Sequence, residues 1–251
     1  MRIVPLARSG SPLPTLICLP GAMCSPLVYE AAARLSGLNA DALAWLEDDG
    51  AFTLDAIARR IVDAVPAGQD LILVGHSLGT PLAVLATLAA QQRAGVRIRG
   101  LVLANSGANT KGHGDASGIV RRIEAEWGEP MWQAFAARCF RTLPAPPLRD
   151  AIVGYPEQLR SAAVAQAIRS QIETDLLPLL PGLPAMPVAV VHGAYDVART
   201  LAHAEELAGA IPGAALHVLE TGHTSCAEAP EAFAAILRSV AERAAGSDAA
   251  R

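Results

Sequence analysis

The chain has 251 residues, 52% of them hydrophobic, and a formal net charge of −4 at pH 7. This length suits one α/β domain with a large core, while the negative balance, without any basic run, argues against nucleic acid or an anionic membrane as a partner. No apolar run reaches the roughly 18 residues that a membrane-spanning helix requires, and the segment after Arg2 lacks the apolar core of a secretory signal, so we expect a cytoplasmic protein that is a monomer or a homodimer.

Short apolar strands alternate with amphipathic helices along the first hundred residues. Strands are predicted at 16–19, 43–46, 71–74 and 98–104, and helices at 27–35, from 53 to about 65, and directly after 79. Thr53 is a suitable N-cap for the second of these helices. This alternation is typical of a parallel sheet covered by helices on both faces.

The alternation stops between Asn105 and Pro187. Helical stretches are predicted at 118–127, 130–140 and 158–177, separated by prolines, with no convincing strand. We expect a helical insertion over the sheet. It carries Trp127, Trp132, Phe135 and Phe140, which either attach the insertion to the body or wall an apolar pocket.

Strands and helices alternate again in the last quarter of the chain. Strands are predicted at 188–191 and 216–219, and helices at 200–210 and 230–244. The predicted organisation is therefore a core formed by residues 1–104 and 188–251, interrupted by the insertion at 105–187.

The stretch LILVGHSLG, from Leu71 to Gly79, joins a predicted strand to a predicted helix through a tight turn with Ser77 at its apex. Glycines two residues before and two residues after a serine let the strand and the helix approach closely. Alone, this GxSxG pattern is equally compatible with an ordinary strand-to-helix turn. Residues elsewhere in the chain must decide whether Ser77 is a nucleophile.

Two such residues follow later strands. Asp196 comes after the strand at 188–191, and His223 after the strand at 216–219, so both are expected at the sheet edge that carries Ser77, where ligands bind in open α/β sheets. A serine hydroxyl requires a neighbouring imidazole to take its proton, and a carboxylate orients that imidazole. Each residue is weak evidence alone, but the order Ser, Asp, His after a GxSxG turn is specific.

With LPGAMCS at 19–25, GHSLG at 75–79, HGAYD at 192–196 and GH at 222–223, the chain resembles the α/β-hydrolase superfamily over nearly its full length. The resemblance implies an α/β fold with an eight-stranded, mostly parallel central sheet flanked by helices and a helical cap inserted after the sixth strand. The first antiparallel hairpin is expected to be reduced to part of Met1–Ala7. The resemblance also implies an oxyanion hole, with backbone N–H groups from Leu78 and from Ala22, or Met23 as the alternative to Ala22.

Other candidate residues rank lower. The alternative position for the acid, after the strand at 98–104, holds Asn105 and Ser106, which favours Asp196. His76 is expected to line the site or to pack, and His203 and His217 to lie on the surface. His113 and Asp115 lack the further ligands that a metal site needs. The four cysteines, at 18, 24, 139 and 226, have no CxxC spacing and are expected to be reduced.

These observations predict a serine hydrolase that cleaves a small-molecule carboxylic ester, thioester or lactone through an acyl-enzyme, without a metal or cofactor. The catalytic residues would be Ser77, Asp196 and His223. One alternative is a carbon–carbon bond hydrolase or lyase with the same triad, and another is a non-hydrolytic small-ligand binder or accessory protein. Candidate pocket residues are His76, Trp127, Trp132 and Phe135. With these aromatic residues and with arginines at 121, 122, 138 and 141, the insertion permits a small apolar acyl group, an acidic one or a carrier-bound substrate, although helix arginines are usually solvated.

Overall fold

The computed structural model describes residues 1–112 and 115–246, which form a seven-stranded sheet in the order β1-β3-β2-β4-β5-β6-β7. Only β1 is antiparallel to its neighbour; the other pairs are parallel. The strands are β1 (Arg2–Ala7), β2 (Thr15–Leu19), β3 (Ala40–Ala44), β4 (Asp70–His76), β5 (Arg97–Ala104), β6 (Val188–Gly193) and β7 (Ala215–Leu219). β4 lies in the middle of the sheet, so its carboxyl end is surrounded by other elements.

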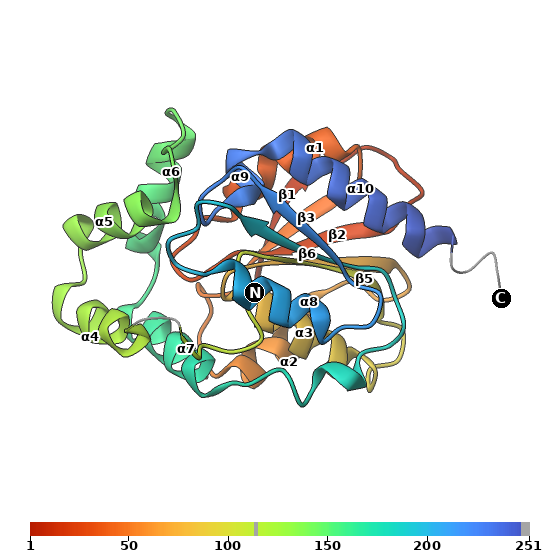
Figure 1. Ribbon diagram of the computed structural model, residues 1–251, viewed down its shortest axis with the longest axis horizontal. Helices are drawn as coiled ribbons and strands as arrows, with labels where there is room; N and C mark the ends of the chain where they lie inside the picture. The colour runs from red at the N-terminus through yellow and green to blue at the C-terminus, as the bar shows by residue number, and fades with distance from the viewer. Residues whose placement is uncertain (113–114, 247–251) are drawn as a thin grey trace.

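Helices cover both faces of the sheet because its central strands are apolar on both sides. Figure 1 shows α1, α9 and α10 over one face and α2, α3 and α8 over the other. Their bounds are α1 (Glu30–Ser36), α2 (Leu54–Ala64), α3 (Gly79–Ala90), α8 (Leu201–Gly209), α9 (Ser225–Glu228) and α10 (Pro230–Gly246). Each layer encloses its own cluster of buried hydrophobic residues. As expected, Thr53 caps α2, its side chain accepting the N–H of Ala56 at 3.4 Å.

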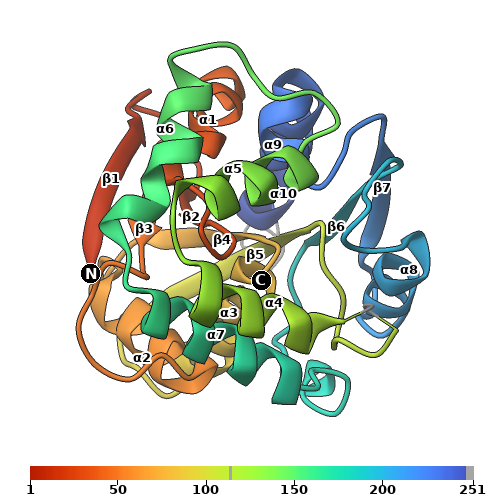
Figure 2. The same ribbon diagram turned by 90° about the vertical axis from the view of Figure 1, so that its left-hand side faces the viewer.

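Between β5 and β6 the described residues form four α-helices: α4 (Ala116–Glu126), α5 (Glu129–Cys139), α6 (Leu148–Gly154) and α7 (Ser161–Glu173). Figures 1 and 2 show them grouped at one end of the sheet. This helical segment forms hydrogen bonds with the body through α7 and through the end of α5. Gln166 and Ser170 on α7 accept the N–H groups of Phe52 and Leu54, at 2.8 and 2.9 Å, while Thr224 donates to the carbonyl of Cys139 at 2.9 Å.

The sheet differs from the sequence-based expectation at its N-terminal edge. The resemblance implies eight strands, whereas the described residues form seven. At this edge the described residues form one antiparallel strand, β1, in place of a hairpin, as expected for a hairpin reduced to part of Met1–Ala7. The helical segment consequently follows the fifth strand of this chain rather than the sixth.

The second predicted strand is shifted as well. The apolar run at 43–46 indicated a strand, but β3 spans Ala40–Ala44 and ends before Trp45. Ala40 and Ala42 are small enough to be fully buried between neighbouring elements, while Trp45 turns into the core and donates from Nε1 to the carbonyl of Pro20 at 2.9 Å.

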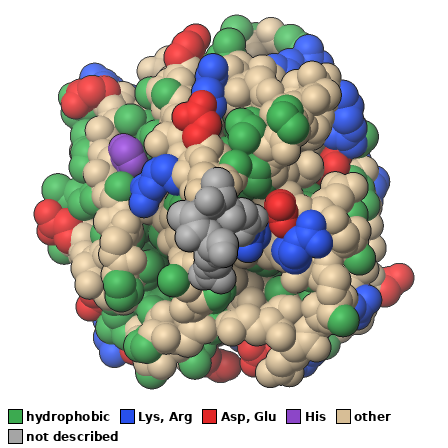
Figure 3. Space-filling view, turned by 90° about the vertical axis from the view of Figure 1, so that its right-hand side faces the viewer, with side chains coloured by type: hydrophobic (Ala, Val, Ile, Leu, Met, Phe, Trp, Pro, Cys, Tyr) green, Lys and Arg blue, Asp and Glu red, His purple; other side chains and the backbone are tan. Residues whose placement is uncertain are grey.

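The described surface has a mixed character. On the face shown in Figure 3, acidic and basic side chains are interspersed with apolar ones. Among the described residues, no helix is long and apolar enough to cross a membrane.

Candidate active site

Ser77 stands at the turn between β4 and α3 in a strained backbone conformation. Its φ angle of 53° lies in the left-handed region, which residues with side chains rarely adopt. A Cβ added to Gly75 would lie 2.4 Å from the carbonyl oxygen of Gly79, and one added to Gly79 would lie 1.9 Å from that of Leu19. Strand and helix therefore approach more closely than larger residues would allow, and Ser77 is held beyond the carboxyl end of β4.

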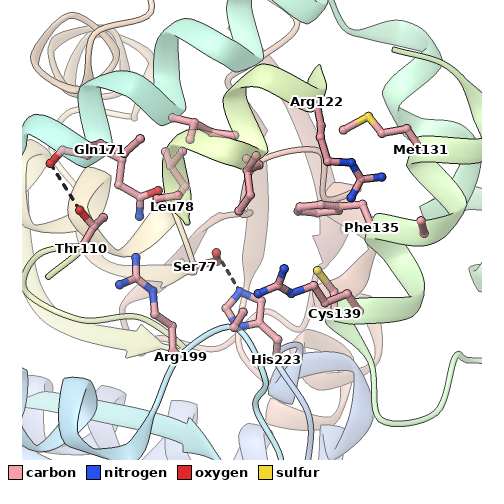
Figure 4. Close-up of a pocket in the computed structure, with 18 residues that line it drawn as sticks. Ser77, Leu78, Thr110, Arg122, Met131, Phe135, Cys139, Gln171, Arg199 and His223 are labelled. Carbon is pink, nitrogen blue, oxygen red and sulfur yellow. Dashed lines mark hydrogen bonds between the residues drawn. The ribbon is translucent and has the colours of Figure 1, made fainter. Parts of the chain in front are cut away.

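The structure brings Ser77, His223 and Asp196 together in one hydrogen-bonded chain. Ser77 Oγ lies 2.9 Å from His223 Nε2, and His223 Nδ1 lies 2.7 Å from Asp196 Oδ2. Figure 4 shows the Ser77 side chain pointing toward the His223 ring. With its proton on Nδ1, the imidazole donates to the carboxylate, and Nε2 is free to accept the proton of the serine hydroxyl.

The Asp196 side chain is fully buried and surrounded by donors. Oδ1 accepts the backbone N–H groups of Ala198 and Arg199 at 2.8 and 2.9 Å, and Oδ2 accepts the Asn105 amide at 3.2 Å as well as His223. Burial alone would raise the pKa of Asp196, but His223 and the backbone hydrogen bonds outweigh it and hold the pKa well below its ordinary value. The carboxylate therefore stays charged at neutral pH.

Asn105 is a site residue that sequence reasoning set aside. It follows β5 with a φ angle of 51° and is fully buried. Besides Asp196, its amide donates to the carbonyl of Gly222 at 3.2 Å, and its Oδ1 accepts the N–H of Ser225 at 3.4 Å. Asn105 thus links the acid to the loop that carries His223. In the sequence, the only sign of this role is that Asn105 follows a strand, at the alternative position for the acid.

The predicted oxyanion-hole amides are unoccupied by other acceptors. Among the described residues, none accepts a backbone hydrogen bond from Ala22, Met23 or Leu78. Ala22 and Leu78 line the same cavity as Ser77 and His223, whereas Met23 lines a smaller neighbouring cavity. Ala22 therefore has the better position of the two candidates for the second donor.

His76, directly before Ser77, is buried and held against the His223 loop. Its Nε2 lies 2.7 Å from the carbonyl oxygen of His223, so Nε2 carries the proton, and the two rings are 5.2 Å apart. Burial, together with the neighbouring His223, lowers the pKa of His76 to about 3. His76 is therefore neutral at physiological pH and positions the backbone of His223.

A cavity of about 110 Å³ opens above Ser77, between the sheet edge and helices α4, α5 and α7. Figure 4 shows its lining. Of the predicted pocket residues, Phe135 lines both this cavity and the smaller one, while His76 and Trp132 line the smaller one and not this cavity. Trp127 lines neither and packs edge-on against Trp132, with ring centroids 5.6 Å apart.

The remaining candidates lie outside this chemistry. His203 was expected on the surface, but it is buried. Both of its ring nitrogens have partners: Nδ1 accepts the N–H of Thr200 at the start of α8, and Nε2 donates to the carbonyl of Lys111. All four cysteines are buried and free, and burial raises the pKa of each thiol. His113 lies outside the described residues, and those described contain no cluster of three or more metal-ligating side chains.

Comparison with known families agrees with this fold. The model of a family described as "Alpha/beta hydrolase family" matches residues 16–236, which is most of the chain. The protein therefore belongs to the alpha/beta hydrolase family.

Solved structures of similar fold include two enzymes. The enol-lactonase from Burkholderia xenovorans LB400 aligns with a TM-score of 0.78 and 19% identity, covering 95% of this chain and 94% of the other. An esterase from Exiguobacterium antarcticum aligns with a TM-score of 0.77 and 17% identity, covering 96% and 94%. No curated protein matches this sequence significantly. At these identities the structural likeness establishes the fold alone.

Proposed function

We propose that the protein is a serine hydrolase that cleaves a carboxylic ester, thioester or lactone, with Ser77 as nucleophile, His223 as base and Asp196 as the orienting acid. The observation that carries this proposal is the hydrogen-bonded chain from Ser77 to Asp196 at the floor of a cavity. The lactonase and the esterase of similar fold act in this class of chemistry, which supports the proposal further.

In the proposed reaction, Ser77 Oγ attacks the carbonyl carbon while its proton passes to His223 Nε2. The N–H groups of Leu78 and Ala22 hold the oxyanion of the tetrahedral intermediate. His223 then gives the proton to the leaving oxygen or sulfur as its bond to the carbonyl carbon breaks. Water attacks the resulting acyl-enzyme in the same two steps, giving its proton to His223 and finally releasing the acid and the Ser77 hydroxyl.

We further propose that residues 105–187 act as a cap on a core formed by 1–104 and 188–251. Side chains from α4, α5 and α7 provide much of the cavity lining, which supports a role of this segment in selecting the substrate. Cleavage of a carbon–carbon bond would use the same three side chains. Matched ester, thioester and lactone substrates, with a β-diketone as the substrate for carbon–carbon cleavage, would distinguish these reactions.

A fluorophosphonate probe tests the proposal directly, because it labels only an activated serine. We expect rapid labelling of the wild type, none of Ser77→Ala, and a fall in kcat on the order of 10⁴ or more in that variant. Ser106→Ala is the matched control, because the Ser106 hydroxyl is buried without a hydrogen-bond partner. A folded wild-type protein that resists labelling would contradict the proposal and favour a non-hydrolytic binder.

A further inference from the structure

The cavity above Ser77 is lined by positive charge. Arg122, Arg138 and Arg199 all line it, and no aspartate or glutamate does so among the described residues. This lining contrasts with the net charge of −4 of the whole chain. A site of one sign enclosed by protein concentrates ligands of the opposite sign.

Of these three arginines, Arg199 is the buried one. Only 5% of its surface is exposed, and its Nη1 donates to the carbonyl of Asn109 at 2.9 Å. Burial lowers the pKa of Arg199 to about 10, so the guanidinium is still charged at neutral pH. Figure 4 shows its side chain rising from the loop after β6 on the Thr110 side of Ser77.

The Arg199 guanidinium has no carboxylate partner among the described residues. Asp196 is near enough to favour its charge, but both Asp196 oxygens are taken by His223, Asn105 and two backbone N–H groups. Nε and Nη2 of Arg199 donate to no described residue. Neither nitrogen is among the fully buried side-chain atoms that lack a hydrogen-bond partner, so both are accessible. Both donors are therefore open to the cavity. A buried charge in this state is costly unless a ligand pairs with it.

The other two arginines lie at the exposed side of the cavity. Arg122 pairs with Glu126 at 3.0 Å, and Arg138 forms no ion pair with any described residue. Both are exposed, so solvent screens them, and they attract an anion rather than fix its position. Arg199, by contrast, offers two donors in a fixed plane, which suits a carboxylate.

We propose that Arg199 binds a carboxylate on the substrate, so that the natural substrate is a small ester, thioester or lactone carrying a free acid group on its acyl part. The small cavity, about 110 Å³, favours a short acyl chain with a terminal carboxylate. This inference rests on the proposed hydrolase function for its substrate class. The anion site itself rests only on the burial, charge and open donors of Arg199.

A pair of chromogenic esters tests the substrate preference: mono-p-nitrophenyl glutarate and its neutral counterpart p-nitrophenyl pentanoate. We expect the wild type to favour the glutarate ester in kcat/KM. In Arg199→Met this ester should lose about 10- to 100-fold, mainly through KM, in line with loss of a charged hydrogen bond, while the pentanoate ester changes little. Arg199→Lys should recover part of the loss. Arg121→Met is the matched control, because Arg121 is exposed, pairs with Asp115 and lines no part of the cavity.

Direct binding separates the anion site from the reaction. Titration of glutarate into Ser77→Ala by calorimetry should give binding that weakens by a similar factor in Ser77→Ala with Arg199→Met, and only partly with Arg199→Lys. If neither ester is hydrolysed but this difference in binding holds, the proposed function fails and the anion site stands. Equal losses on both esters in Arg199→Met, a wild-type preference for the neutral ester, or glutarate binding that ignores Arg199 would each overturn the inference.

Discussion

His76 and Asn105 fix the loop that carries His223 by holding its backbone. His76 donates to the carbonyl of His223, and Asn105 donates to that of Gly222 while also contacting Asp196. His76 is the last residue of β4, and Asn105 directly follows β5, the strand that lies between β4 and β6. The position of His223, the proposed base, thus depends on two buried side chains that have no proton-transfer role in the proposed reaction.

Asn105→Ala tests this role of positioning. The variant removes the donor to Asp196 and leaves the buried carbonyl of Gly222 without its partner, so we expect kcat to fall about 10- to 100-fold, for a loss of about 1–3 kcal/mol, with little change in KM. Steady-state kinetics on a short ester measures both constants. The control is Asn39→Ala, which removes comparable hydrogen bonds to Ser9, Gly10 and Ser11 in a distant loop. Equal loss of kcat in the two variants would contradict the assignment.

The sequence alone predicted that Ser77, Asp196 and His223 lie close together. It did not predict the residues that hold them in place. Ser77, Asp196 and His223 each follow a strand, and parallel strands end at one edge, so their meeting could be inferred from order. The contact between Asn105 and Gly222 spans 117 positions and depends on the φ of 51° at Asn105, which no local pattern indicates. Arg199 was missed for a similar reason: its burial comes from packing against the Asn109 loop.

At the scale of elements, the strand–turn–helix unit of β4 and α3 is the most constrained part of the fold. β4 pairs with both β2 and β5, and α3 is buried along most of its length. The carbonyl of Leu19 on β2 faces the start of α3 so closely that Gly79 has no room for a Cβ. The turn that carries Ser77 is therefore fixed by the neighbouring strand β2 as well as by its own backbone conformation.

Gly79→Ala should consequently destabilise the protein by at least about 3 kcal/mol, at the upper end of the cost of overpacking. The added Cβ would meet backbone, which can move only if the helix separates from the sheet. Urea unfolding measures the change. The control is Gly209→Ala at the end of α8, where an added Cβ meets nothing within 4 Å, so we expect a neutral or slightly stabilising effect, up to about 1 kcal/mol. A Gly79→Ala protein as stable as the wild type would refute this packing.

Most elements were predicted within a few residues, including the short strands β2, β6 and β7, but two short helices were not. β5 and α2 have strong apolar patterns, and their predicted ranges differ little from those observed. α6 lies in a proline-rich stretch, and α9 has only four residues, so neither shows a helical repeat of its own. The edge strand β1 is partly exposed and ends at a polar turn, and only its pairing with β3 defines it.

At the scale of the whole molecule, the cavity forms where three parts of the chain meet: the central strands, the helical segment and the loops after β6 and β7. Glu228 joins two of them, because its carboxylate accepts the N–H of Gly222 at 3.1 Å and that of Arg141 at 2.9 Å. The helical segment is thereby tied to the loop of His223 itself. We therefore expect changes in that segment to alter the position of His223, the proposed base, as well as the cavity lining.

The buried, neutral His76 also makes the stability of the whole protein depend on pH. Its folded-state pKa of about 3 lies below the ordinary value of 6.5. Below pH 6.5 the unfolded chain therefore binds a proton that the folded protein excludes, and stability falls as the pH is lowered, by about 2 kcal/mol at pH 5 from this residue. Carboxylates titrate mostly below that pH.

Urea unfolding at pH 7 and pH 5 should show this loss in the wild type and a smaller one in His76→Gln, which keeps a donor for the carbonyl of His223. His217→Gln, at a half-buried position on β7 where burial lowers the histidine pKa less than it does at His76, should remove a smaller part of the wild-type loss than His76→Gln does. If His76→Gln lost as much stability between the two pH values as the wild type, His76 would not be the group responsible.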